Sequence, residues 1–156
     1  MKADIIASCG TSWIDRIISI ATQSPITHVA MKIDDDFIME STWVGVKMSK
    51  YSKFKTTKHY ILRCHELSEE QQDQVVKFIK DAVDVPYDYR LFFGLALERF
   101  FGIKKYIKDS KDKYMCIELI IEAFKSVGVN LLPNIVDEEI EPDSLLYSPY
   151  LMMVNE

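Results

Sequence analysis

Apolar and polar positions along residues 1–64 predict an early antiparallel sheet. Residues 4–8 form a short apolar run typical of a buried strand. Residues 27–33 alternate, so that Val29, Met31 and Ile33 share one face while His28, Ala30 and Lys32 share the other. The aspartates at 34–36 are a turn signal, and residues 37–41 are expected to return as the second arm of a hairpin. Further strands are expected at 45–48 and 59–64.

Two helices are predicted by a 3.6-residue period that follows a capping residue. Ser12 as N-cap and Asp15 at N3 precede the apolar positions of residues 13–22, which are Ile14, Ile17, Ile18 and Ala21. Ser68 and Gln71 form a capping box before a second helix, which ends before Pro86. Its apolar stripe consists of Val75, Phe78, Ile79 and Ala82.

Two more helices are expected in the second half of the chain. Residues 92–101 are rich in aromatic side chains, and a last helix opens near Tyr114 and continues through Phe124 and Val127. Gly128 suits the residue that follows a helix end. The tail carries two prolines and short strand-like pieces. The sequence therefore predicts one α+β domain over residues 1–156, with a small antiparallel sheet or barrel packed against helices.

Composition narrows the classes of partner. The chain has 48% apolar residues, enough for a sizeable core, and a net charge of −5, which argues against nucleic-acid binding. No apolar run is long enough for a membrane span, and the first residues lack a signal-peptide pattern, so we expect a cytoplasmic protein. Lysines gather at 47–58 and 104–113. They are expected on solvated surface, with peripheral contact to anionic lipid as the alternative.

The three cysteines are an odd number and lack the CxxC spacing of a metal site. We therefore expect reduced thiols, with neither a disulfide framework nor a structural zinc, and we expect no cofactor. Cys64 and His65 are no metal pair, because adjacent strand residues point to opposite faces.

Cys116 lies at the start of the last predicted helix. Unpaired N–H groups and the helix dipole favour negative charge at that position, so the sulfur can be held as a thiolate. Cys9 lies before another helix start and is the rival nucleophile, although no histidine is placed for it locally. A buried, inert core residue is the alternative for Cys116.

His28 and Glu40 are expected on one face of the hairpin. A three-residue loop at 34–36 pairs Ile33 with Phe37 and Ala30 with Glu40, which places His28 diagonal to Glu40. A carboxylate there could hold the imidazole in one tautomer and orientation. The opposite face, with Val29, Met31, Phe37 and Met39, is expected to be core.

Several short segments, in order along the chain, resemble one enzyme family. They are DII at 4–6, WIDRII at 13–18, SPITHVA at 24–30, FIMES at 37–41, GV at 45–46, PYDY at 86–89, YMCIELI at 114–120 and IEPDSL at 140–145. This order resembles the circularly permuted papain-like hydrolases of the NlpC type, the YiiX-like relatives, in which the histidine precedes the cysteine. Ala3, Ala30 and Ile117 depart from the family pattern, in which the first two positions are glycine and the third is often serine.

The resemblance implies a permuted papain-like fold and a cysteine hydrolase of the amidase or peptidase type. In that fold Cys116 would be the nucleophile, His28 the base and Glu40 the orienting residue. Tyr87 and Tyr114 would line the substrate cleft, with buried packing as their alternative. The implied substrate is a peptide, an amide or an acyl lipid. A lipid-directed thiol acyltransferase or esterase, and a binding module without turnover, remain as alternatives.

Overall fold

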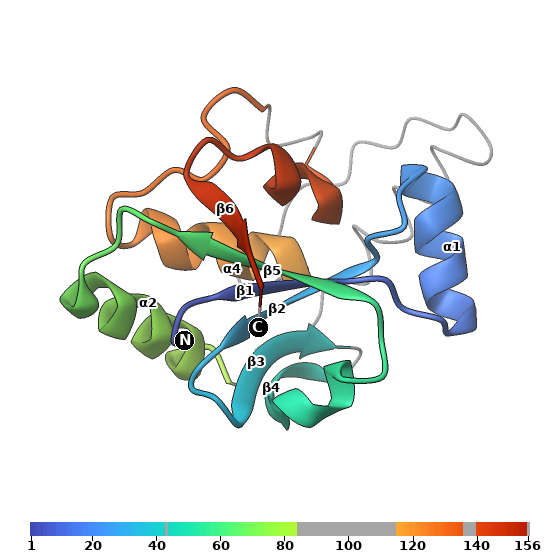
Figure 1. Cartoon of the computed structure of the whole chain (residues 1–156), viewed down its shortest axis with the longest axis horizontal. Coiled ribbons are helices and arrows are strands. Elements are labelled where there is room, and N and C mark those ends of the chain that lie inside the picture. Colours follow the sequence, from blue (N-terminus) through green and yellow to red (C-terminus); the bar gives the residue numbers. More distant parts are fainter. Residues whose placement is uncertain (43, 84–114, 136–139, 156) are drawn as a thin grey trace.

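The computed structural model describes residues 1–42, 44–83, 115–135 and 140–155, and its centre is a twisted six-stranded sheet (Figure 1). The strands are β1 (Ile5–Ser8), β2 (His28–Lys32), β3 (Phe37–Thr42), β4 (Gly45–Lys50), β5 (His59–Cys64) and β6 (Leu151–Val154). They lie in the order β4-β3-β2-β1-β5-β6, and each neighbouring pair is antiparallel. With its helices the protein is an α+β fold, as the sequence predicts.

The hairpin between β2 and β3 has the predicted register. The Asp34 carboxylate accepts the N–H groups of Asp36 and Phe37, each at 2.8 Å, and so closes the turn. Ala30 lies opposite Glu40 in the ladder, which confirms the predicted pairing. Phe37 differs from expectation: it is 36% exposed, because it lies where the strand leaves the turn at the rim of the sheet.

The helices begin where the capping residues predict. In α1 (Trp13–Thr22) and α2 (Glu69–Asp81), Ser12 with Asp15 and Ser68 with Gln71 form the expected capping boxes. The helix α4 (Cys116–Lys125) is followed by Gly128 at φ 84°, whose N–H donates to Lys125 O at 2.9 Å. Only a residue that tolerates positive φ closes a helix in this way, so the predicted role of Gly128 is confirmed.

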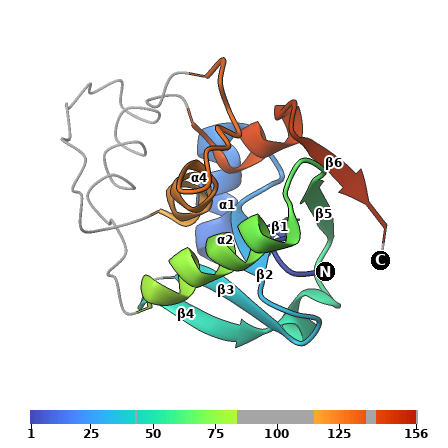
Figure 2. The same ribbon diagram turned by 90° about the vertical axis from the view of Figure 1, so that its left-hand side faces the viewer.

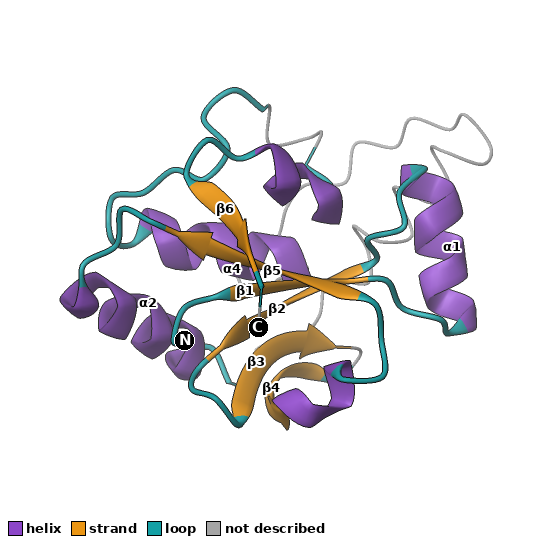
Figure 3. Ribbon diagram, viewed as in Figure 1, coloured by secondary structure: helices purple, strands orange, loops and turns teal. Residues whose placement is uncertain are grey.

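Helices α2 and α4 pack together, and α4 also contacts β2 and β3 (Figures 2 and 3). Apolar residues of both helices join one face of the sheet in the main core, which includes Val29, Met31, Ile79 and Phe124. Helix α1 stands at one end of the sheet, away from α2 (Figure 1).

The 3-10 helix η1 (Tyr51–Phe54) forms a second, smaller core. Its members are Ile6, Ala30, Ile38, Tyr51 and Phe54. Because Ala30 and Ile38 belong to the sheet face that also carries His28 and Glu40, η1 is fixed beside those two residues. A further 3-10 helix, η3 (Pro142–Tyr147), precedes β6.

Several sequence-based expectations fall on residues that the structure does not describe. They are Tyr87, Tyr114, the aromatic helix at 92–101 and the lysines at 104–113. Ala3 lies among the described residues, at the position where the similar enzyme family has glycine. Its φ is 62°, a conformation that favours glycine. Within the described ranges, none of the helices combines the length and apolar character needed to cross a membrane.

Candidate active site

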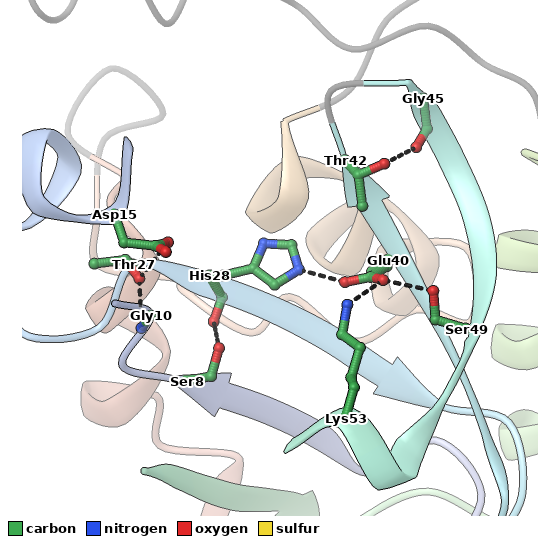
Figure 4. A network of polar contacts seen from close by, with 10 residues as sticks. All are labelled: Ser8, Gly10, Asp15, Thr27, His28, Glu40, Thr42, Gly45, Ser49 and Lys53. Carbon is green, nitrogen blue, oxygen red and sulfur yellow. Dashed lines mark hydrogen bonds and ion pairs between the residues drawn. The ribbon is translucent and has the colours of Figure 1, made fainter. Parts of the chain in front are cut away.

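His28 is held at the first position of β2 by contacts on either side of it. It lies opposite Ser8 of β1, whose hydroxyl donates to the His28 carbonyl at 3.3 Å. The preceding Thr27 accepts from the Gly10 N–H at 2.9 Å and donates to Asp15 Oδ1 at 3.0 Å (Figure 4). The loop before α1 and the first turn of α1 thereby fix the chain immediately before the histidine.

Glu40 projects from the middle of β3 and is 1% exposed. Its Oε2 lies 2.9 Å from His28 Nε2, so the predicted diagonal pair is in direct contact (Figure 4). Its Oε1 accepts the Ser49 hydroxyl at 2.7 Å and the Lys53 ammonium. Both carboxylate oxygens are therefore bound by hydrogen-bond donors, as a buried charge requires.

Cys116 is the first residue of α4 and is 6% exposed. Its side chain interacts with the His28 imidazole and contributes to the raised pKa of that histidine. Because Nε2 of the imidazole faces Glu40, Nδ1 is the ring nitrogen that remains for the sulfur. The imidazole thus bridges a cysteine on α4 and a glutamate on β3.

The start of α4 has further polar groups next to the sulfur. The Glu118 carboxylate accepts the Met115 N–H at 2.7 Å and so caps the helix. The N–H groups of the first helical residues have no acceptor within the helix. Such N–H groups at a helix start can donate to an anion.

The contacts of His28 and Glu40 shift the pKa values of both groups. Burial on its own lowers the pKa of His28, but the hydrogen bonds to Cys116 and Glu40 and the charges of both partners raise it to about 9. Burial on its own raises the pKa of Glu40, but His28 above all, then Lys53 and Ser49, lower it to about 2. At neutral pH the pair is therefore an imidazolium and a carboxylate.

The other two cysteines lack these neighbours. Cys64 lies in the main core, and burial raises the pKa of its thiol. Cys9 is half-buried, and its N–H donates to Lys58 O at 2.8 Å. All three cysteines are free thiols. Of the five residues that the sequence singled out, Cys116, His28 and Glu40 come together, while Tyr87 and Tyr114 lie outside the described residues.

Sequence reasoning missed Ser49 and Lys53. The strand predicted at 45–48 stops one residue before Ser49, whereas β4 continues to Lys50. Extending the alternation by two residues would have placed Ser49 on the same face as Glu40. Lys53 offered no such signal, because it lies on η1 and was only one of five lysines in a basic stretch.

Comparison with known proteins gives a similarity of fold but no match of sequence family. No family model matches the sequence, and no curated protein matches it either. The structure is similar to the crystal structure of the metalloprotein YiiX from Escherichia coli O157:H7, with a TM-score of 0.76. The match covers 100% of this chain and 97% of YiiX at 17% sequence identity. The protein therefore has a YiiX-like fold, and at this identity the likeness extends to the fold alone.

Proposed function

We propose that the protein is a cysteine hydrolase of the amidase or peptidase type, in which Cys116, His28 and Glu40 form the catalytic triad. The observations that carry this proposal are the contact of His28 Nε2 with Glu40 Oε2 at 2.9 Å and the interaction of the same imidazole with the Cys116 side chain, which helps to raise the pKa of His28. A nucleophile, an acid–base group and an orienting group in that order are what acyl transfer through a covalent intermediate requires.

In the first half of the reaction, the Cys116 thiolate attacks the substrate carbonyl carbon and forms the S–C bond. The carbonyl oxygen becomes an oxyanion, to which the N–H groups at the start of α4 donate. As the carbon–nitrogen bond breaks, His28 Nδ1 gives its proton to the leaving amine. The products are an amine, a thioester on Cys116 and a neutral imidazole.

In the second half, the neutral His28 removes a proton from water, and the resulting hydroxide attacks the thioester carbon. The carbon–sulfur bond breaks, the acid leaves, and the thiolate–imidazolium pair is restored. Glu40 holds Nε2 throughout, so that Nδ1 keeps facing the reacting atoms. If a second substrate replaces water as acceptor, the same steps transfer the acyl group instead.

Two other functions are compatible with the same fold. A lipid-directed thiol acyltransferase or esterase would use the same thioester, and the lysines of η1 and its neighbours, Lys50, Lys53, Lys55 and Lys58, favour an anionic surface nearby. A binding module without turnover would keep the fold but would not need an imidazole bonded to a cysteine. The substrate is accordingly a peptide, an amide or an acyl lipid.

A metal-dependent reaction is the remaining candidate, because the similar structure is described as a metalloprotein. Among the described residues, no group of three or more His, Cys, Asp and Glu side chains could hold a metal ion. Glu40 already accepts from His28, Ser49 and Lys53, so a cation would have to displace the Lys53 ammonium. The described residues do not fit a metal, and the proposed reaction uses none.

Selective alkylation tests the proposal without a known substrate. Cys116 and Cys64 are each 6% exposed, and Cys9 is more exposed than either. Exposure alone would therefore make Cys9 react first and the other two react equally. We expect iodoacetamide at pH 7 to modify Cys116 at least about 10-fold faster than Cys64, because only Cys116 has an imidazolium partner.

The matched variant is His28→Ala, which removes that partner. It should reduce the alkylation of Cys116, measured by peptide mass spectrometry, to the rate of Cys64 while leaving Cys9 and Cys64 unchanged. Equal rates for Cys116 and Cys64 in the unmodified protein, or no effect of His28→Ala, would exclude the catalytic function.

A further inference from the structure

We infer that Lys53 is a positioning residue of this site: its ammonium, together with the Ser49 hydroxyl, holds Glu40 so that only Oε2 faces His28. The inference rests on the proposed function, which gives the orientation of His28 its purpose. Ser49 and Lys53 both donate to Oε1, whereas Oε2 is the oxygen that contacts His28. The carboxylate is therefore held from the side away from the imidazole, and its plane cannot turn without breaking two contacts.

The structure of η1 explains why Lys53 reaches Glu40. Tyr51 and Phe54 of η1 are 3% and 4% exposed and pack in the smaller core against Ile38 and Ala30. This packing fixes the backbone of η1 beside β3. The Lys53 ammonium also lies 5.0 Å from the centre of the Phe54 ring, which restricts the lysine further.

Charge balance gives Lys53 a second effect on the site. Glu40 is almost fully buried, and the ammonium at its Oε1 adds a positive charge beside the carboxylate and the His28 imidazole. Losing that positive charge makes it harder to remove a proton from the site, so the site should reach its reactive form at higher pH.

Other charged groups are near, but none replaces Lys53 at Glu40. Lys47 lies opposite Glu40 on β4 and is exposed to solvent. Lys32, farther along β2, lies above the Tyr51 ring and 3.8 Å from Asp35. On α4, Glu118 is engaged with the Met115 N–H. In the part of the chain that the structure describes, none of these three hydrogen-bonds a Glu40 oxygen, whereas Lys53 binds one directly.

The test is the pH profile of Cys116 alkylation by iodoacetamide in three variants of the full chain. In Lys53→Met the pH at which the alkylation rate rises should increase by about 0.5–1 unit, and the rate at pH 7 should fall about 3- to 10-fold. Lys53→Arg keeps a cationic donor and should restore the original profile. Lys55→Met removes the same charge two residues away and should leave the profile unchanged.

The inference would be overturned by a Lys53→Met profile that coincides with that of the unmodified protein, or by an equal shift in Lys55→Met. A lower rate without any shift would assign Lys53 a purely structural role and would also contradict the inference. Carbon NMR of the Glu40 carboxyl group keeps the test independent of catalysis. Lys53→Met should raise its pKa from about 2 even if Cys116 proves unreactive, in which case only the proposed function fails.

Discussion

Replacement of Glu40 by glutamine tests whether the negative charge of Glu40 raises the pKa of His28. Glutamine has nearly the same shape and keeps an oxygen that accepts the His28 Nε2–H, so the imidazole retains a partner. The substitution removes the negative charge 2.9 Å from that nitrogen, and its amide nitrogen takes the place of the oxygen that accepts from Ser49 and Lys53. We therefore expect the pKa of His28 to fall while the histidine stays in place.

The size of the fall follows from the contacts of His28. Its pKa is raised from 6.5 to about 9 although burial opposes the charged form. At about 1.4 kcal/mol per unit, the protonated ring is stabilised by roughly 3 kcal/mol relative to water. Cys116 contributes more than Glu40 to this increase. Glu40→Gln should therefore lower the pKa of His28 by about 1–2 units, to the range of about 7–8.

The assay is an NMR titration of the imidazole resonances of His28 in the two proteins. Glu122→Gln makes the same chemical change on α4, at an exposed residue paired with Lys125, and should not move the pKa of His28. A value within about 0.3 units of the unmodified protein in Glu40→Gln would refute the assignment of Glu40 as the charged partner.

Three further outcomes are expected. Gly10→Ala would place a Cβ 2.1 Å from the Asp15 carboxyl carbon, so it should lower the free energy of unfolding by about 1–3 kcal/mol in urea titrations; an unchanged midpoint would contradict this packing. The pKa of Glu40 is lowered from 4.5 to about 2, so its carboxylate contributes fully to the free energy of unfolding above pH 4.5 and loses that contribution as the pH falls through 2. The contribution is about 3 kcal/mol, and the free energy of unfolding of Glu40→Gln should not show this loss when the protein is titrated with acid. Cys116→Ala should lower the pKa of His28, measured by NMR, because the hydrogen bond to sulfur is lost.

The sequence was sufficient for the local parts of the site. Ladder register depends on turn length and on the two-residue period, both of which are visible in the chain. For that reason the pairing of Ala30 with Glu40 could be predicted, and with it the diagonal position of His28. The apolar period likewise predicted a helix opening near Tyr114, and α4 begins two residues later, at Cys116.

Contacts between distant segments could not be predicted in this way. The meeting of Cys116 with His28 depends on how α4 packs on β2 and β3, and no local pattern encodes that packing. Lys53 reaches Glu40 only because Tyr51 and Phe54 anchor η1 in the smaller core. The exposure of Phe37 likewise depends on its place at the rim, although its position in the alternation matches that of core residues.

The most direct test of the central claim is to trap the acyl-enzyme. The protein would be incubated with panels of peptide amides and acyl lipids, quenched in acid, and examined by intact-mass and peptide mass spectrometry. The account predicts a thioester adduct on the peptide that contains Cys116, which is absent in Cys116→Ala and in His28→Ala and is released by hydroxylamine. An adduct on Cys9 or Cys64 instead, or turnover that persists in Cys116→Ala, would contradict it.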